Sequence, residues 1–163
     1  MSTNWLIILV IVAAVISPIF WLMPSPRQRY QMELRKQAMH AGLKVRIEKL
    51  KLNGQEYSAV AYRWMREDKK NVYRFKVART ARLEKEEIGI YGDPFIEGWH
   101  WLEEPMPIAD AATLAKLEEM LKALPADTMI LEGGTATLTL WWHENGSPED
   151  VQKLAELFAQ SPV

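Results

Sequence analysis

The run WLIILVIVAAVISPIFWLM, Trp5–Met23, holds nineteen residues without a formal charge and divides the chain into two parts. A helix of this length rises ~1.5 Å per residue, so it spans about 28 Å, close to the hydrocarbon thickness of a bilayer. Trp5 and Trp21 fall near its two ends, where indoles favour the boundary between membrane and water. The run therefore predicts a transmembrane anchor over residues 1–24.

The residues on either side of this run predict its orientation. A cleaved signal peptide is the alternative, but Met1–Asn4 carries no Lys or Arg, the run exceeds the usual ~7–15 apolar residues, and no small-x-small site follows it. Basic residues come directly after the run, at Arg27, Arg29, Arg35 and Lys36. Because positive charge stays on the cytoplasmic side, we expect a periplasmic N-terminus and a cytoplasmic C-terminal domain.

Residues 25–42 have the pattern of a basic amphipathic helix next to the membrane. Ser25 is suited to cap it, with Pro26 at the first helical position and Gly42 as its terminator. Its apolar side chains recur at near-helical spacing: Tyr30, Leu34, Ala38 and Ala41. We expect this stripe to pack on the domain, and the four basic residues named above to contact anionic headgroups.

The net charge of −1 conceals a division of charge along the chain. Residues 27–85 hold seventeen basic and six acidic side chains, whereas residues 86–163 hold three lysines and fifteen acids. Basic residues near an anionic leaflet gain ~1 kcal/mol each. Attraction of the basic half to the membrane surface is one interpretation, and two solvated faces of different charge are the other.

The first half of the domain, which we assign to residues 43–163, alternates apolar and polar residues as half-buried strands do. One strand begins at Leu43 and reaches a hairpin turn at Asn53-Gly54. A return strand covers Glu56–Arg66. After a turn at residues 68–71 comes a third strand with Tyr73, Phe75 and Val77 on one face, and residues 88–91 suggest a short fourth. These strands predict a meander with one apolar and one basic face.

The second half predicts helices and a further hairpin. Residues 93–108 contain three prolines and are expected to form a long surface loop. Asp110 then caps a helix that Pro125 ends, and Gly133-Gly134 joins two strands. Ser147 begins a capping box before the last helix. The predicted order β-β-β-(β)-α-β-β-α describes an α+β domain with helices packed on an antiparallel sheet.

No residue pattern identifies a cofactor, metal or catalytic site. The chain has no cysteine, and His40, His100 and His143 lack the local spacing of zinc ligands. His143-Glu144 could pair a base with an orienting group, but no nucleophile motif accompanies it. We therefore predict neither cofactor nor metal. A membrane-tethered enzyme, or a small-ligand or lipid-binding domain, that uses this pair and the Trp99–Trp101 loop remains the alternative.

The positions of the aromatic residues bear on two possible partners, a nucleic acid and a protein. In the third strand the aromatic side chains lie opposite the cations, which favours core packing and disfavours a stacking platform for nucleic acid. Trp99, His100 and Trp101 stand in the predicted loop, and aromatic side chains are enriched at binding hot spots. They form a candidate partner surface, although in a small domain a tryptophan-rich loop more often closes the edge of the core.

Three stretches of the sequence, two of them split, can be compared with a known family: the anchor with PSPRQ at 24–28, MELR at 32–35 and AGL at 41–43; residues 99–105; and LPAD at 124–127 with 138–142 and ENG at 144–146. Through these stretches the chain resembles a family of proteobacterial inner-membrane proteins labelled as preprotein translocase subunit YajC-like. It implies an inner-membrane location beside the translocon. The two predicted helices after residue 108 depart from the shorter YajC plan. Together these features predict a non-catalytic single-pass accessory protein with a membrane protein partner.

Overall fold

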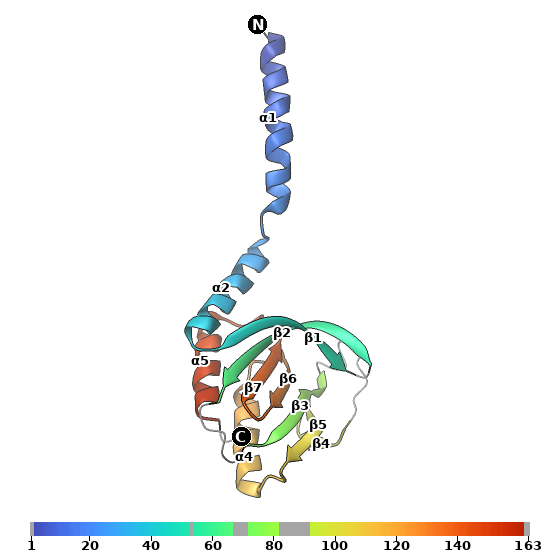
Figure 1. Ribbon diagram of the computed structural model, residues 1–163, viewed down its shortest axis with the longest axis vertical. Helices are drawn as coiled ribbons and strands as arrows, with labels where there is room; N and C mark the ends of the chain where they lie inside the picture. Colours follow the sequence, from blue (N-terminus) through green and yellow to red (C-terminus); the bar gives the residue numbers. More distant parts are fainter. Residues whose placement is uncertain (1, 53, 67–71, 82–91, 162–163) are drawn as a thin grey trace. The chain divides into compact units, whose positions relative to one another are not determined.

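The protein is seen here as a computed structural model that describes residues 2–52, 54–66, 72–81 and 92–161 (Figure 1). Within these residues the fold is α+β, with four helices and a seven-stranded antiparallel open sheet. The chain divides into two compact units, Met1–Met32 and Glu33–Val163. The predicted fold class is confirmed at this level.

The first unit contains α1 (Ser2–Leu22) and the beginning of α2 (Pro26–His40). Side chains 4–17 of α1 are all exposed. The cap at Ser25 is confirmed, because its Oγ accepts from the backbone N–H of Gln28 at 3.2 Å and the Gln28 side chain accepts from the Ser25 N–H at 2.8 Å. Among the residues whose placement is described, no helix is both long enough and apolar enough to cross a membrane.

The second unit begins within α2, whose last turns pack on the domain. Leu34 and Ala38 are fully buried, as the predicted stripe requires, whereas Tyr30 is exposed. Gly42 ends the helix with a φ of 91°, a conformation that glycine adopts without a Cβ clash. The N–H of Leu43 then donates to the Ala38 carbonyl at 2.9 Å, which satisfies one of the last free carbonyls of the helix.

The seven strands are β1 (Lys44–Leu52), β2 (Gln55–Met65), β3 (Arg74–Arg79), β4 (Pro94–Ile96), β5 (Trp99–Met106), β6 (Thr128–Gly133) and β7 (Thr137–Trp142). Their order in the sheet is β1-β2-β7-β6-β3-β5-β4. The meander prediction is therefore wrong beyond its first hairpin. The C-terminal β6–β7 hairpin lies between β2 and β3, and alternation within single strands gives no sign of such an insertion.

The predicted loop at residues 93–108 is also corrected, because most of it forms β4 and β5. Its period-2 pattern places Trp99 and Trp101 in the core and leaves His100 half-buried between them. The prolines led to the loop prediction, yet Pro94 starts an edge strand, a position that needs no N–H donor. The predicted turn at 68–71 and the short strand at 88–91 lie outside the described residues.

Both predicted caps of the later helices are confirmed. Asp110 accepts from the Thr113 N–H at 2.8 Å and starts α4 (Ala111–Ala123). Ser147 and Asp150 form a reciprocal capping box at the start of α5 (Pro148–Ala159). Capping fixes where each helix begins, and therefore which of its side chains meet the sheet.

Apolar side chains are buried on both faces of the sheet. The first core, which includes Leu34, Tyr62, Leu121, Trp142 and Leu154, joins the sheet to α2, α4 and α5. The opposite face was predicted to be basic, and the burial of apolar side chains there corrects that prediction. This face holds a second core, whose residues are Leu50, Leu52, Ala59, Ala61, Ala78, Met129, Ile130 and Trp141.

The second core depends on the curvature of the β1–β2 hairpin. β2 pairs with β7 only along Val60–Met65, so the hairpin extends past the end of β7. In Figure 1 it is a long curved ribbon at the top of the domain. Leu50 and Leu52, near its tip, belong to one cluster with Met129 and Ile130 of β6. The bent hairpin thus buries apolar surface that no described helix covers.

Gly133 marks the tightest contact between β6 and β3. A Cβ built there would overlap the buried Phe75 ring and lie 3.0 Å from the Tyr73 carbonyl oxygen. The absence of a side chain is what lets these two strands meet with Phe75 packed across them. At the neighbouring Gly134 a Cβ would meet only the Thr137 side chain at 3.3 Å and its carbonyl oxygen at 3.4 Å.

We therefore expect Gly133→Ala to lower the free energy of unfolding by about 1–3 kcal/mol, because an overpacked core must shift Phe75 or the strand. Gly134→Ala is the matched control and should change it by less than about 1 kcal/mol. Urea unfolding of a fragment that begins at Ser25, followed by circular dichroism, measures both. Equal losses in the two variants would contradict this account of the strand contact.

Candidate functional site

A buried carboxylate, Glu144, occupies the loop between β7 and α5. Its φ of 57° is in the left-handed region, where a residue other than glycine is strained. Only 1% of its side chain is exposed, so the charge has lost nearly all of its water. A buried charge of this kind needs compensation by cations and hydrogen-bond donors.

Arg35 of α2 and Tyr62 of β2 supply that compensation. The Arg35 Nε donates to Oε1 of Glu144 at 2.7 Å and Nη2 donates to Oε2 at 2.5 Å, in the two-pronged geometry that guanidinium and carboxylate favour. The Tyr62 hydroxyl donates to Oε1 at 2.9 Å. We call these three residues the Glu144 cluster. It joins a helix, a strand and a loop that are far apart in the sequence.

The protonation states of the two donors, Arg35 and Tyr62, are fixed near neutral pH. The hydrogen bond to Glu144 raises the pKa of Arg35 above its already high value. Burial, and then the adjacent Glu144 charge, raise the pKa of Tyr62 well above its usual value of 10.0. Neither donor can release its proton under physiological conditions. The cluster is therefore suited to hold elements in place, and poorly suited to transfer a proton.

The residues after Glu144 make further contacts that hold the loop in place. The Asn145 N–H donates to the buried Asp127 carboxylate at 2.8 Å, which ties the loop to the segment before β6. Ser147 then caps α5, as described above. From Trp142 to α5 the chain is therefore held by a half-buried ion pair, a half-buried hydrogen bond and a helix cap in succession. The direction in which α5 leaves the sheet follows from these contacts.

The predicted membrane-contact residues have different environments. Arg27, Arg29 and Lys36 are exposed, and the Arg29 Nε donates to the Pro24 carbonyl at 3.2 Å. Arg35 differs from the expectation, because its guanidinium binds Glu144 and only 25% of its side chain is exposed. Sequence patterns could not reveal this pair, since 109 positions separate its members and each has charged or polar neighbours.

The candidate partner surface is largely inside the domain. Trp99 is 2% exposed and Trp101 is 8% exposed. The Arg79 guanidinium lies 4.6 Å from the centre of the Trp99 ring, and Phe75 and Phe95 pack against Trp101. His100 is half-buried, with Nδ1 at 2.6 Å from the Thr80 hydroxyl. Because both indoles are buried, little of their surface is left for the partner contact predicted at Trp99–Trp101.

The alternative pocket would have to combine the Trp99–Trp101 segment with His143-Glu144. Two strands, β6 and β3, separate β7 from β5 in the sheet. Three strand spacings of ~4.8 Å put the two segments about 14 Å apart. The Glu144 carboxylate also already accepts from Arg35 and Tyr62. Within the described residues, no group of three His, Asp or Glu side chains could hold a metal ion.

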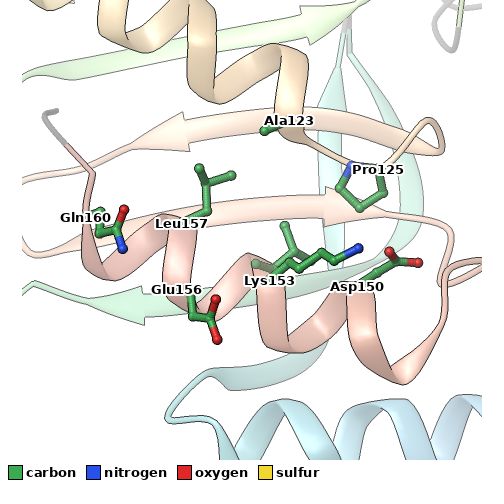
Figure 2. A pocket seen from close by; sticks show the side chains of 8 residues that line it. Ala123, Pro125, Asp150, Lys153, Glu156, Leu157 and Gln160 are labelled. Atoms are coloured by element: carbon green, nitrogen blue, oxygen red, sulfur yellow. The ribbon is translucent and has the colours of Figure 1, made fainter.

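Grooves lie on both sides of α5. One groove, of about 400 Å³, lies between α4 and α5. Figure 2 shows its lining, which includes Asp150, Lys153, Glu156 and Leu157 of α5, and Pro125 just after α4. A second groove, of about 420 Å³, lies between α5 and α2 and is lined by residues such as His40 and Gln152. Sequence analysis did not find these grooves, because they arise from helix spacing.

Comparison of the chain with protein-family models, with curated proteins and with solved structures finds no match.

The Arg35–Glu144 pair can be compared directly with a second pair of the same chemistry. Arg63 binds Glu48 through two contacts of 2.6 Å, but those side chains are 27% and 28% exposed. We expect Arg35→Met to lower the free energy of unfolding by about 3–5 kcal/mol, because it leaves a buried carboxylate without its cation. Arg63→Met should cost about 1 kcal/mol or less, since water can solvate Glu48.

Double-mutant cycles with Glu144→Gln and Glu48→Gln test this difference by urea unfolding of the same fragment. The coupling energy should be about 2 kcal/mol for the pair with the buried Glu144 and below about 1 kcal/mol for the pair whose two members are both half-buried. Equal coupling in the two cycles would show that burial of Glu144 does not govern the stability of this loop.

Proposed function

We propose that the protein is a non-catalytic, single-pass accessory protein of the bacterial inner membrane that binds a membrane protein partner through its cytoplasmic domain. The observation that carries the proposal is α1, a helix of 21 residues whose sequence has no charged side chain. At ~1.5 Å per residue it is about 31 Å long, which matches the hydrocarbon layer.

The exposed side chains of α1 support an anchor. Trp5, Leu9 and Val15 are all largely exposed, and the mean character of the helix is strongly apolar. Apolar surface of this extent is unfavourable in water, and lipid chains are the simplest environment that would cover it. The uncharged sequence continues through Met23, and this run of nineteen residues is the segment that we propose crosses the bilayer.

Arg27, Arg29 and Lys36 support the cytoplasmic orientation and contact with anionic headgroups. All three are exposed and follow directly after the uncharged run. Arg35 contributes to the stability of the domain instead, through Glu144. The headgroup proposal therefore rests on three basic residues.

The groove between α4 and α5 is the surface we favour for the partner. It has an apolar floor, to which Leu154, Leu157 and Pro125 contribute, and a charged rim that includes Lys153 and Glu156. Binding surfaces commonly combine an apolar centre with a polar rim. The distance between Trp99 and His143 speaks against the enzyme alternative. A partner of the translocon class follows from the resemblance to YajC-like proteins.

Orientation is tested by reporter fusions at the C-terminus of the full chain. A reporter that works only in the cytoplasm should be active, and a periplasm-dependent reporter should be inactive. Replacing Arg27, Arg29 and Lys36 by glutamine should produce a mixed orientation, because it removes most of the charge bias. Arg35→Gln is the matched control and should keep the orientation while lowering stability. An active periplasmic reporter on the unaltered chain would refute the orientation.

Partner binding is tested by purifying the tagged full chain in mild detergent and identifying what accompanies it by mass spectrometry. Lys153→Glu with Glu156→Lys exchanges two rim charges without changing the net charge, and should reduce the recovered partner at least about tenfold. The exchange Glu118→Lys with Lys122→Glu is the control, since that 2.5 Å pair lies on the exposed surface of α4. Equal loss with both exchanges would reject the groove, and no specific companion would reject the accessory role.

A further inference from the structure

β1 ends the sheet, and one of its edges has no strand beside it among the described residues. Leu52 pairs with Gln55, so two residues connect β1 to β2. The pair that flanks a two-residue turn is hydrogen-bonded, and hydrogen-bonded pairs then alternate along an antiparallel ladder. Leu52, Leu50, Glu48 and Arg46 therefore bond to β2. The backbone groups of the residues between them, including Val45, Ile47 and Lys49, point outward.

The side chains along this edge are unusual for a solvated edge strand. Ile47, at its middle, is 63% exposed although it is a large apolar residue. Arg46 and Glu48 flank it with opposite charges and share the other face of the strand, where the Glu48 carboxylate also binds Arg63 of β2 and keeps lone pairs for a second cation. Edge strands commonly carry lysine, which discourages indiscriminate pairing, and Lys44, Lys49 and Lys51 serve that purpose here. An arginine and a glutamate placed symmetrically about an isoleucine instead suggest a specific partner.

We infer that β1 is a dimerisation strand that pairs antiparallel with β1 of a second copy of this chain, about a two-fold axis through Ile47. In this register Ile47 lies opposite Ile47 of the other copy, and Arg46 of each copy lies opposite Glu48 of the other. Val45 lies opposite Lys49, so the outward backbone groups of both strands meet and form about six hydrogen bonds. The two sheets become one continuous sheet.

The neighbouring registers are less favourable for a simple electrostatic reason. An axis through Arg46 would place two arginines opposite each other, and an axis through Glu48 would oppose two glutamates. Like charges directly opposite are destabilising, whereas opposite charges stabilise the pairing. Any register that moves one strand by an odd number of residues fails to align the outward backbone groups. Among registers that pair most of β1, the axis through Ile47 combines matched charges with matched hydrogen bonds.

The chain offers a direct test because it contains no cysteine. Ile47→Cys would place two thiols opposite each other, with Cα atoms ~5.5 Å apart, inside the range that a disulfide or a short bismaleimide can bridge. Mild oxidation of the full chain in detergent should therefore give a reducible dimer on a non-reducing gel. Because Ile47 is exposed, its replacement should not unfold the domain.

Lys51→Cys is the matched control on the same edge. Its two copies would lie eight residues apart along the paired strands, about 26 Å, and should not crosslink. Crosslinking at both positions would indicate random collision, and no crosslinking at position 47 would exclude the paired strand. Either result would overturn the proposal.

A second pair of variants tests the register in the Ile47→Cys chain. Arg46→Glu would oppose glutamates across the axis and should slow crosslinking about fivefold, even though it lowers the positive charge of the strand. Lys44→Glu makes the same change in charge opposite the apolar Leu50, and should leave the rate unchanged or raise it. Equal effects of the two substitutions would reject the Arg46–Glu48 pairing and with it the proposed axis.

Discussion

The buried charge of Glu144 is the constraint on which the arrangement of this domain depends. Its carboxylate is stable inside the protein only while Arg35 and Tyr62 are both in place. That requirement fixes the end of α2 against β2, and fixes the loop that leads into α5 against both. The apolar contacts of the first core would tolerate small shifts among these elements, whereas a two-pronged ion pair tolerates very little.

The same ion pair divides the basic residues of α2 into two groups. Arg35 faces the domain, while Arg27, Arg29 and Lys36 remain exposed. In the topology that we propose, such a helix would connect the anchor to the folded domain. The membrane anchor, the partner-binding groove and the dimerisation strand β1 are separate proposals, and each concerns a different surface. The groove beside α5 and the free edge of β1 lie on separate elements, so a dimer could still bind a partner.

Local patterns predicted the elements well, and non-local contacts account for what was missed. The caps at Ser25, Asp110 and Ser147 depend on residues a few positions apart, and all three are present. The position of β7 beside β2 depends on residues more than seventy positions apart, and alternation within one strand carries no information on its neighbour. The Glu144 cluster was missed for the same reason. The Trp99–Trp101 strand was missed because prolines outweighed its alternation.

The insertion of β7 beside β2 has a consequence for biosynthesis. Residues 60–65 are made before their partners at 137–142, so more than seventy further residues must be synthesised before the two strands can pair. Pairing across such a separation is slow, because the entropy lost in closing a long loop comes before the stabilising contacts form. The apolar side chains of the nascent β1–β2 hairpin therefore stay exposed until β7 has been made, a period in which aggregation competes with folding. A chaperone bound during translation, or early attachment of the nascent chain to the membrane, would shield it.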